Sequence, residues 1–245
     1  MNRIELIREL IRKGKLTSYL EIGSQSGKSF LPVRCKIKIA VDPKFIIPFK
    51  NKIKWLIRNP YNLFSKYFEE TSDDFFEKRK ALLAEIPKLD IALIDGLHTF
   101  EASLKDTLNT LNYVNNSGII ILHDCFPQNK AVATPAASMD AAQAMDVEGW
   151  TGQWCGDVWK TIVYLRKSHP DELEAYVINT DFGLGIVRRK QDLPKKFDID
   201  ETLFNSIDNI DYDDMIDDVD MIGLKEPTYV HKLIESFKGN NQTNT

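Results

Sequence analysis

Four apolar stretches of the sequence end in an acidic residue or in a glycine turn. Glu21 and Gly23 close the first stretch, Asp42 closes the second, and Asp95 and Asp124 follow two later ones. A strand needs no acid at its end for stability, whereas a carboxylate can accept a proton, bind hydroxyl groups or hold a cation. Several carboxylates at strand ends therefore indicate a binding or catalytic site.

Two histidines accompany the later acids. His98 comes three residues after Asp95, and His123 directly precedes Asp124. The unperturbed pKa of an imidazole, roughly 6.5, suits proton acceptance near neutral pH. We therefore expect His98 to act as a general base, and capping of the helix that follows is its alternative role.

Asp95 and Asp124 end strands that should be neighbours in a parallel sheet. Their oxygens could hold a hard divalent cation such as Mg²⁺, with His123 as a further ligand. A neutral imidazole at this position would make a weaker magnesium site than a second acid, or would favour a softer metal. The alternative is that both carboxylates accept hydrogen bonds from the backbone or from a cofactor.

The first glycine turn, Glu21-Ile22-Gly23-Ser24-Gln25-Ser26-Gly27-Lys28-Ser29, has three interpretations. It fails as a dinucleotide-binding fingerprint, because Gln25 and Lys28 stand where the second and third glycines belong. It is one residue too short for a phosphate-binding P-loop, although it contains Gly-Lys-Ser. As E-x-G-x-x-x-G after a strand, it resembles motif I of the class I S-adenosylmethionine-dependent methyltransferases, where only glycine lets the backbone pass close to the cofactor.

Further motifs strengthen this resemblance. Asp42 lies about 20 residues after the turn, at the place of an acid that accepts both ribose hydroxyls. The segments Ile94-Asp95-Gly96-Leu97-His98-Thr99-Phe100-Glu101, His123-Asp124 and Gly156-Asp157-Val158-Trp159-Lys160 resemble a bacterial methyltransferase family with the pattern IDGxH(x)(Y/F)E…HD…GDVWK. The resemblance runs from about Tyr19 to Arg188.

This resemblance implies an activity and a set of site residues. The activity is O-methylation, by S-adenosylmethionine, of a sugar or another polyhydroxylated small molecule, as in the similar sugar and macrolide O-methyltransferases. His98 would take the hydroxyl proton, and Trp154 and Asp157 would contact a sugar, nucleotide-sugar or glycoconjugate substrate. A divalent cation would bind Asp95, Asp124 and His123. The expected cofactor-binding residues are Glu21, Gly23, Ser24, Gly27, Ser29, Asp42, Ser72, Asp73, Asp95 and Gly96.

Two other functions stay open. The first is a P-loop-like nucleotide hydrolase, which the loop spacing and Asp42 disfavour. The second is a catalytically silent protein of the methyltransferase fold that only binds ligands. Intact Gly23, Gly27, Asp42 and His98 argue against a decayed site.

Strand and helix patterns alternate along the chain. This order predicts an α/β fold, a Rossmann-like doubly wound and mostly parallel sheet that ends in an antiparallel hairpin strand. The hairpin is expected at 174–188, around Asp181-Phe182-Gly183. Ser72-Asp73 is the expected N-cap of a helix over 74–85, and residues 45–60 show no clean period.

Charge and loop length divide the chain. We expect a methyltransferase domain over 1–190, with the long loop 127–156 as a lid, and an acidic C-terminal helical extension over 191–245. Residues 198–220 hold ten acids and no Lys or Arg, whereas residues 34–58 hold eight Lys/Arg and a single acid. The basic stretch is either a surface that attracts an anionic ligand or a solvated helix face.

Composition limits the remaining choices. Hydrophobic residues make up 43% and charged residues 28% of the 245, with a formal net charge of −4. Three cysteines without CxxC spacing argue against a disulfide scaffold or a zinc ribbon, and no apolar run reaches the roughly 20 residues of a membrane span. We expect a cytoplasmic enzyme that forms a homo-oligomer if it assembles at all. We expect no nucleic-acid partner, because basic and aromatic residues do not interleave.

Overall fold

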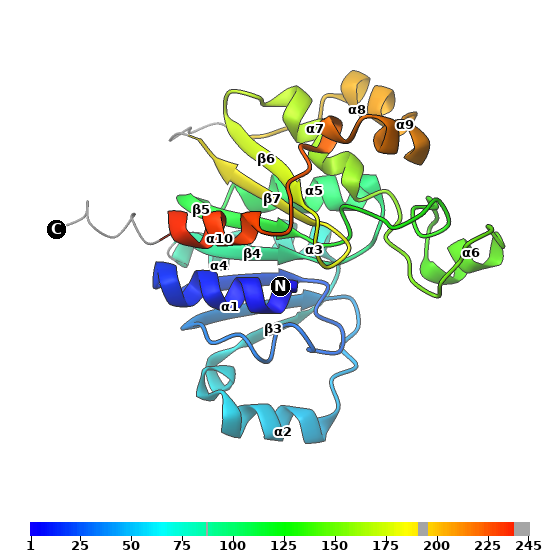
Figure 1. Ribbon diagram of the computed structural model, residues 1–245. Helices are drawn as coiled ribbons and strands as arrows, with labels where there is room; N and C mark the ends of the chain where they lie inside the picture. Colours follow the sequence, from blue (N-terminus) through cyan, green and yellow to red (C-terminus); the bar gives the residue numbers. More distant parts are fainter. Residues whose placement is uncertain (87, 191–195, 238–245) are drawn as a thin grey trace.

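The computed structural model describes residues 1–86, 88–190 and 196–237. Its centre is a seven-stranded sheet in the order β3-β2-β1-β4-β5-β7-β6, covered by helices on both faces (Figure 1). The Rossmann-like doubly wound sheet predicted from the sequence is confirmed. The strands are β1 (Ser18–Ile22), β2 (Ile37–Asp42), β3 (Lys66–Glu69), β4 (Leu89–Ile94), β5 (Val114–Leu122), β6 (Leu173–Ile178) and β7 (Leu184–Arg189).

One strand runs against the others. β1 to β5 pair in parallel, and β7 is antiparallel to both β5 and β6. The hairpin therefore forms as predicted, but its antiparallel strand lies between β5 and β6 rather than at the edge. The parallel strands all end on one side of the sheet, where ligands bind in open α/β folds.

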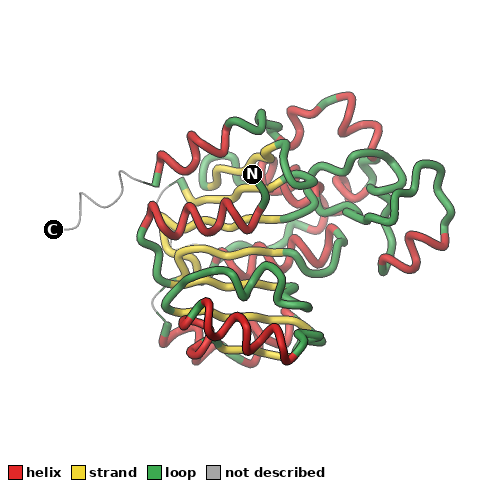
Figure 2. The backbone as a smooth tube through the Cα atoms, turned by 60° about the horizontal axis from the view of Figure 1, so that its bottom comes forward, coloured by secondary structure: helices red, strands yellow, loops and turns green. Residues whose placement is uncertain are grey.

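Each face of the sheet carries its own apolar cluster. One cluster includes Leu104 of α5 and Tyr164 of α7, and the other includes Leu10 of α1 and Leu233 of α10. Figure 2 shows helices on both sides of the strands. The helices of the two faces are α1 (Arg3–Gly14) and α10 (Tyr229–Ser236), against α3 (Ser72–Lys78), α4 (Lys80–Glu85), α5 (Phe100–Leu111) and α7 (Trp159–Ser168).

The first helix brings the N-terminus to the carboxyl ends of the strands. A capping box between Asn2 and Glu5 begins α1, and Leu6, Ile7, Leu10 and Ile11 form its buried face. Since α1 packs on the sheet through this face, its first turn is held in place. This anchoring decides where the side chain of Arg3 lies.

Several helices begin or end where the sequence analysis did not expect. Thr71, and not Ser72-Asp73, is the N-cap of α3, because its hydroxyl accepts from the N–H of Asp74. The helix expected over 74–85 is divided into α3 and α4. Residues 45–60, which showed no clean period, contain α2 (Phe49–Arg58), followed by a 3₁₀ helix, η1 (Pro60–Phe64).

The acidic stretch is not one surface helix. It forms α8 (Glu201–Asp208), α9 (Tyr212–Asp217) and a 3₁₀ helix, η2 (Val219–Ile222). Ile207, Met215 and Ile222 are fully buried and belong to the apolar cluster of α5 and α7. The predicted boundary at 190/191 and the tail from 238 lie outside the described residues.

Gly185 allows β7 to enter the sheet. A Cβ at this position would lie 2.7 Å from Sγ of Cys125 and 3.0 Å from Cδ1 of Ile162. We expect Gly185→Ala to lower the free energy of unfolding by about 1–3 kcal/mol, because the added methyl overpacks this contact. Urea unfolding measures this. In a Cys125→Ala background the same change should cost less, and an equal cost in both backgrounds would contradict the proposed clash.

Candidate functional site

The loops after β1 and β4 touch through their backbones. Gly23 has φ +88°, and a Cβ there would lie 1.9 Å from the carbonyl oxygen of Asp95. Only glycine fits this contact, for both its φ and its size. The glycine turn and the start of the Asp95 loop are therefore fixed relative to each other.

Glu21 supports this turn from inside the protein. Its carboxylate is completely buried and accepts hydrogen bonds from the hydroxyls of Tyr19 and Ser29. Burial raises its pKa to about 7, although these bonds oppose the rise. The carboxylate of Glu21 can thus orient the turn, because Ser29 lies within the loop.

Asp42 connects the second strand to the same loop. Its Oδ2 accepts from the N–H of Gln25 at 2.8 Å, and its Oδ1 accepts from the N–H of Lys44 at 2.8 Å. Each carboxylate oxygen has a second lone pair for a ligand hydroxyl. The geometry thus preserves the predicted role of Asp42 as an acceptor for ribose.

The glycine turn does not lead into a helix. Residues 23–36, all of them described, form turns and extended backbone without a regular helix. A P-loop binds phosphate at the N-terminus of the helix that follows it, and this chain offers no such terminus there. The structure therefore argues against the nucleotide-hydrolase alternative.

Ser72 and Asp73 lie at the first turn of α3, on the other side of Gly96. Asp106 is a buried carboxylate of α5 that the sequence analysis missed, and the side chain of Ser72 favours its charged form. Burial raises the pKa of Asp106 to about 7. Its Oδ2 would lie 3.7 Å from a Cβ at Gly96, whereas Asp73 is exposed.

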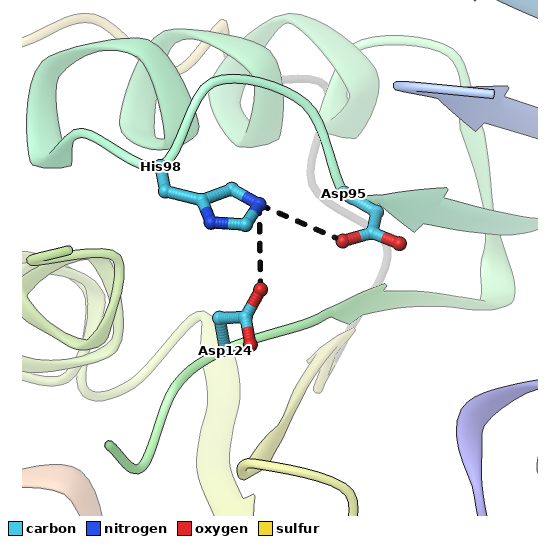
Figure 3. Close-up of side chains that lie close together, drawn as sticks. All are labelled: Asp95, His98 and Asp124. Carbon is cyan, nitrogen blue, oxygen red and sulfur yellow. Dashed lines mark ion pairs between the residues drawn. The ribbon is translucent and has the colours of Figure 1, made fainter. Parts of the chain in front are cut away.

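The carboxyl ends of β4 and β5 bring three of the predicted residues together. The ring of His98 points between the carboxylates of Asp95 and Asp124 (Figure 3). Its Nε2 lies 3.3 Å from Oδ2 of Asp124 and 3.8 Å from Oδ1 of Asp95. One ligand atom from each of these three side chains lies close enough to the others to share a cation, so Asp95, His98 and Asp124 form the candidate cation site.

The backbone carbonyl of Trp154 holds the other nitrogen of this imidazole. Nδ1 of His98 lies 2.7 Å from the carbonyl oxygen of Trp154, so Nδ1 carries the hydrogen. A neutral ring then turns the lone pair of Nε2 towards two carboxylates. Nε2 can therefore accept a proton or bind a cation at this point, and the nearby carboxylates would stabilise either one.

His123 is surrounded by carboxylates that favour its charged form. Burial opposes its charged form, yet hydrogen bonds to Asp124, Asp181 and Asp95 raise its pKa to about 11. Its Nδ1 lies 2.9 Å from Asp124 and 3.2 Å from Asp95. However, Nη1 of Arg3 lies 3.0 Å from Nε2 of His123, and because a guanidinium can only donate, this contact opposes a proton on Nε2. The group of side chains that could share a cation, Asp95, His98 and Asp124, does not include His123, so the metal role of His123 stays a prediction.

Arg3 completes the cluster from the far end of the chain. Its Nε lies 3.1 Å from Oδ2 of Asp95, and its Nη1 lies 3.2 Å from Oδ2 of Asp181. Burial raises the pKa of Asp181, but His123 and Arg3 outweigh it and hold this pKa well below its usual range. The sequence analysis assigned no role to Arg3 and placed Asp181 only in a hairpin turn.

The Gly-Asp-Val-Trp-Lys motif holds the His98 loop. Gly156 has φ +58°, and a Cβ there would lie 1.9 Å from the carbonyl oxygen of His98. Asp157 is buried, and its Oδ1 accepts from the N–H of Phe100 at 2.7 Å, at the start of α5. Asp157 therefore satisfies the N–H of the first residue of α5, next to the N-cap Thr99, and a substrate contact would compete with this bond.

Trp154 covers His98 from the end of the predicted lid. Their ring centroids are 5.3 Å apart, and the indole Nε1 donates to the carbonyl of Thr134 at 2.8 Å. Trp154 itself is buried, with 9% of the residue exposed. Residues 127–156 extend beyond the strand ends and carry α6 (Met139–Ala144) at their tip (Figure 1).

A pocket of about 230 Å³ lies beside the charged cluster. Asp181 belongs to both, since its carboxylate contacts Arg3 and lies 3.6 Å from Nε2 of His123. The turn between β6 and β7, the segment after β5 and helix α9 form the walls. The lining residues are Phe126, Pro127, Gln128, Asn179, Thr180, Asp181, Phe182, Tyr212 and Ile216.

Residues 20–125 match the sequence model of a family described as a methyltransferase domain. The SAH-bound methyltransferase PaMTH1 of Podospora anserina superposes with a TM-score of 0.52 at 15% identity, over 78% of this chain and 80% of its own. The chain has the class I methyltransferase fold. The SAM-bound O-methyltransferase TomG of Streptomyces achromogenes is similar at a TM-score of 0.50 and 10% identity, over 77% and 80% of the two chains. None of the curated proteins matches the chain in sequence.

These findings confirm the resemblance at the level of the domain and the fold. The matched segment of the methyltransferase domain contains Gly23, Asp42, Asp95, His98 and Asp124. It ends before the lid and the acidic extension. Among the described residues, no helix is long and apolar enough to cross a bilayer.

The protonation of His123 gives a prediction for this site. We expect the ring to stay doubly protonated from about pH 6 to pH 9, because Asp124, Asp181 and Asp95 hold its pKa near 11. Nitrogen-15 chemical shifts of the imidazole measure this. By linkage, the raised pKa contributes stability that is complete below roughly pH 6.5 and is lost as the pH rises towards 11.

Urea unfolding across this pH range provides a second readout. The wild-type chain should lose stability between about pH 7 and pH 10 more steeply than His123→Gln, which lacks the linked proton. His231→Gln, at an exposed position of α10, should keep the wild-type profile. A ring that titrates near pH 6.5 would show that the cluster does not stabilise the imidazolium.

Proposed function

We propose that the protein binds S-adenosylmethionine at the carboxyl ends of β1, β2 and β4 and transfers its methyl group to a hydroxyl of a polyhydroxylated small molecule. The observation that carries this proposal is the contact between Gly23 and the backbone of Asp95. It brings the glycine turn, the acid after β2 and the His98 loop to one edge of a methyltransferase fold. PaMTH1 and TomG, which have this fold, were solved with SAH and SAM respectively.

Residues on both sides of the Gly23 contact would hold the cofactor. The turn from Gly23 to Gly27 exposes backbone groups, and Asp42 offers carboxylate lone pairs to two ribose hydroxyls. Ser72 and Asp106 lie across Gly96. Their polar groups would contact the adenine base of the cofactor. Glu21 acts through Ser29, because its own carboxylate is buried.

The sulfonium of the bound cofactor supplies an electrophilic methyl group, so the protein must position the acceptor and remove its proton. In this proposal, Nε2 of His98 accepts the proton of the acceptor hydroxyl. The carbonyl of Trp154 holds Nδ1–H and leaves the Nε2 lone pair free. Once this nitrogen takes the hydroxyl proton, Asp124 at 3.3 Å stabilises the imidazolium.

A divalent cation is the second candidate for the space between His98, Asp95 and Asp124. Two carboxylates and one imidazole form a plausible ligand set. However, Arg3 and His123 already balance two of the three clustered carboxylates, which leaves little net negative charge for Mg²⁺. If Nε2 of His98 bound the metal, it could not act as the base. The role of general base therefore fits the charge balance around His98 better than the role of metal ligand does.

The pocket beside Asp181 suits the acceptor. Its aromatic side chains, Phe126, Phe182 and Tyr212, provide faces on which a sugar ring or another ring can pack. Gln128 and Asn179 provide amide groups that both donate and accept hydrogen bonds to hydroxyls. This mixture of apolar faces and neutral polar groups favours a polyhydroxylated molecule.

Calorimetry with S-adenosylmethionine tests the cofactor site. We expect binding to the wild-type chain and a loss of about 1–3 kcal/mol, roughly 5- to 150-fold, for Asp42→Ala, because a charged acceptor is removed. Asp217→Ala, at an exposed acid of α9, should bind as the wild type does. Thermal unfolding checks that the variant is folded, since Asp42 also holds the loop. Binding of ATP without binding of S-adenosylmethionine would support the hydrolase instead.

Substitution of His98 tests the chemical step. With an acceptor found among sugars, nucleotide sugars and glycoconjugates, His98→Ala should lower turnover by about 10²–10⁴-fold, the usual share of a general base. Affinity for S-adenosylmethionine should barely change. His231→Ala is the control. Activity that is lost on chelation and restored by Mn²⁺ would favour the metal, whereas near-normal turnover of His98→Ala would place the base elsewhere.

A further inference from the structure

The loop and helices between β2 and β3 expose many large apolar side chains. We call this surface the α2 face, made by α2, η1 and Ile46. Phe49 is 73% exposed, Ile57 78%, Leu63 66% and Phe64 71%. Monomeric proteins rarely expose contiguous apolar patches of this kind unless the patch binds something. The α2 face is made of Ile46, Phe49, Ile53, Leu56, Ile57, Tyr61, Leu63 and Phe64.

The exposure of this face is fixed by the packing behind it. None of the ten residues of α2, all of them described, is buried, and only Trp55 packs against the core. The buried Asn59 anchors the end of the helix, since its side-chain amide donates to the carbonyls of Leu31 and Val33. Asn62 adds bonds to the carbonyls of Leu31 and Trp55. These bonds attach the C-terminal end of α2 to the rest of the protein. The apolar side chains of the helix remain exposed.

Apolar and basic side chains lie on different sides of α2. Phe49, Ile53 and Ile57 recur at four-residue spacing and form an apolar stripe. Lys50, Lys54 and Arg58 follow each of them by one residue and form a basic stripe alongside. Residues 44–66 hold six Lys/Arg and no acid. A basic amphipathic helix with aromatic and aliphatic residues on one face is typical of helices that lie in a membrane surface.

We propose that the α2 face docks on the surface of a bilayer that contains anionic lipids. The apolar stripe would enter the boundary between headgroups and acyl chains, and the basic stripe would contact the lipid phosphates and carboxylates. The charge of the patch supports this occupant, because a bilayer of this composition offers both apolar volume and negative charge. Docking of this kind requires no membrane-spanning helix.

Other parts of the same chain are poorer occupants of this surface. Two copies of the α2 face would bring their basic stripes together, and like charges repel. The acidic extension of another copy would match the charge. However, its apolar residues Ile207, Met215 and Ile222 are already buried in their own core, so it cannot cover the apolar stripe. Within one chain, α2 and the acidic extension lie at opposite edges of the sheet, so the extension does not cover the α2 face of its own chain (Figure 1).

Vesicle co-sedimentation of the full chain tests this proposal without a cofactor or an acceptor. Vesicles of phosphatidylcholine with about one third phosphatidylserine should bind the protein at least tenfold more than vesicles of phosphatidylcholine alone, and salt should weaken the binding. The double variant Phe49→Gln/Ile57→Gln should lose at least tenfold in binding, and so should Lys50→Glu/Lys54→Glu. All four side chains are exposed, so folding should be unaffected.

Matched controls change the same residue types on other surfaces. Met139→Gln/Met145→Gln alters exposed apolar residues of the lid, and Lys167→Glu/Lys232→Glu alters exposed lysines of α7 and α10. Both should bind vesicles as the wild type does. Equal loss in these controls, or no binding to anionic vesicles, would overturn the proposal. Sedimentation velocity adds a further check, because a dimer dissociated by Phe49→Gln/Ile57→Gln without any lipid binding would assign the face to a second copy.

Discussion

Three carboxylates, Asp95, Asp124 and Asp181, lie together at the carboxyl edge of the sheet, and the site depends on how their charge is balanced. Buried ions are costly unless they are paired, and removal of one partner leaves an uncompensated charge. Arg3 and His123 provide the two partners. The balance therefore links α1, the ends of β4 and β5, and the turn between β6 and β7 into one unit.

This balance also separates the roles of the two histidines. His123 contacts three carboxylates, which raise its pKa to about 11 and make it a poor proton acceptor and donor near neutral pH. His98 faces two of the same carboxylates, but its other nitrogen is held by a neutral carbonyl. It is also more exposed than His123, with 23% of its side chain accessible against 8%. Of the two, only His98 has a nitrogen that can reach a ligand.

Local patterns predicted the parts of this arrangement that lie within one strand and its loop. Gly23, Asp42, Asp95 and Asp124 follow buried strands, and parallel strands must end at a common edge, so their proximity could be predicted. The role of Gly-Asp-Val-Trp-Lys could not, since it depends on a contact between Gly156 and the backbone of His98. A motif identifies residue types along the chain. This contact depends on the path that residues 127–156 take before they reach Gly156.

The sequence could not reveal Arg3 for a similar reason. Arg3 begins an ordinary amphipathic helix, and its partners Asp95 and Asp181 lie about 90 and 180 residues away. Only the packing of α1 on the sheet brings them together. The helix α2 was missed because its apolar residues mix with lysines. Its pattern is regular, but the exposed side of the helix is the apolar one, contrary to the usual expectation that apolar faces are buried.

The α2 face and the cofactor loop share a short piece of backbone. Between Asp42 and α2, the N–H of Lys44 donates to Asp42, and the N–H of Ile46 donates to the carbonyl of Gln25 at 3.0 Å. The side chain of Ile47 packs where a Cβ of Gly27 would stand. These contacts connect the segment before α2 to the groups that shape the glycine turn. Because packed elements resist small deformations, a ligand in this turn and a surface that fixes α2 would each restrict the motion of the other.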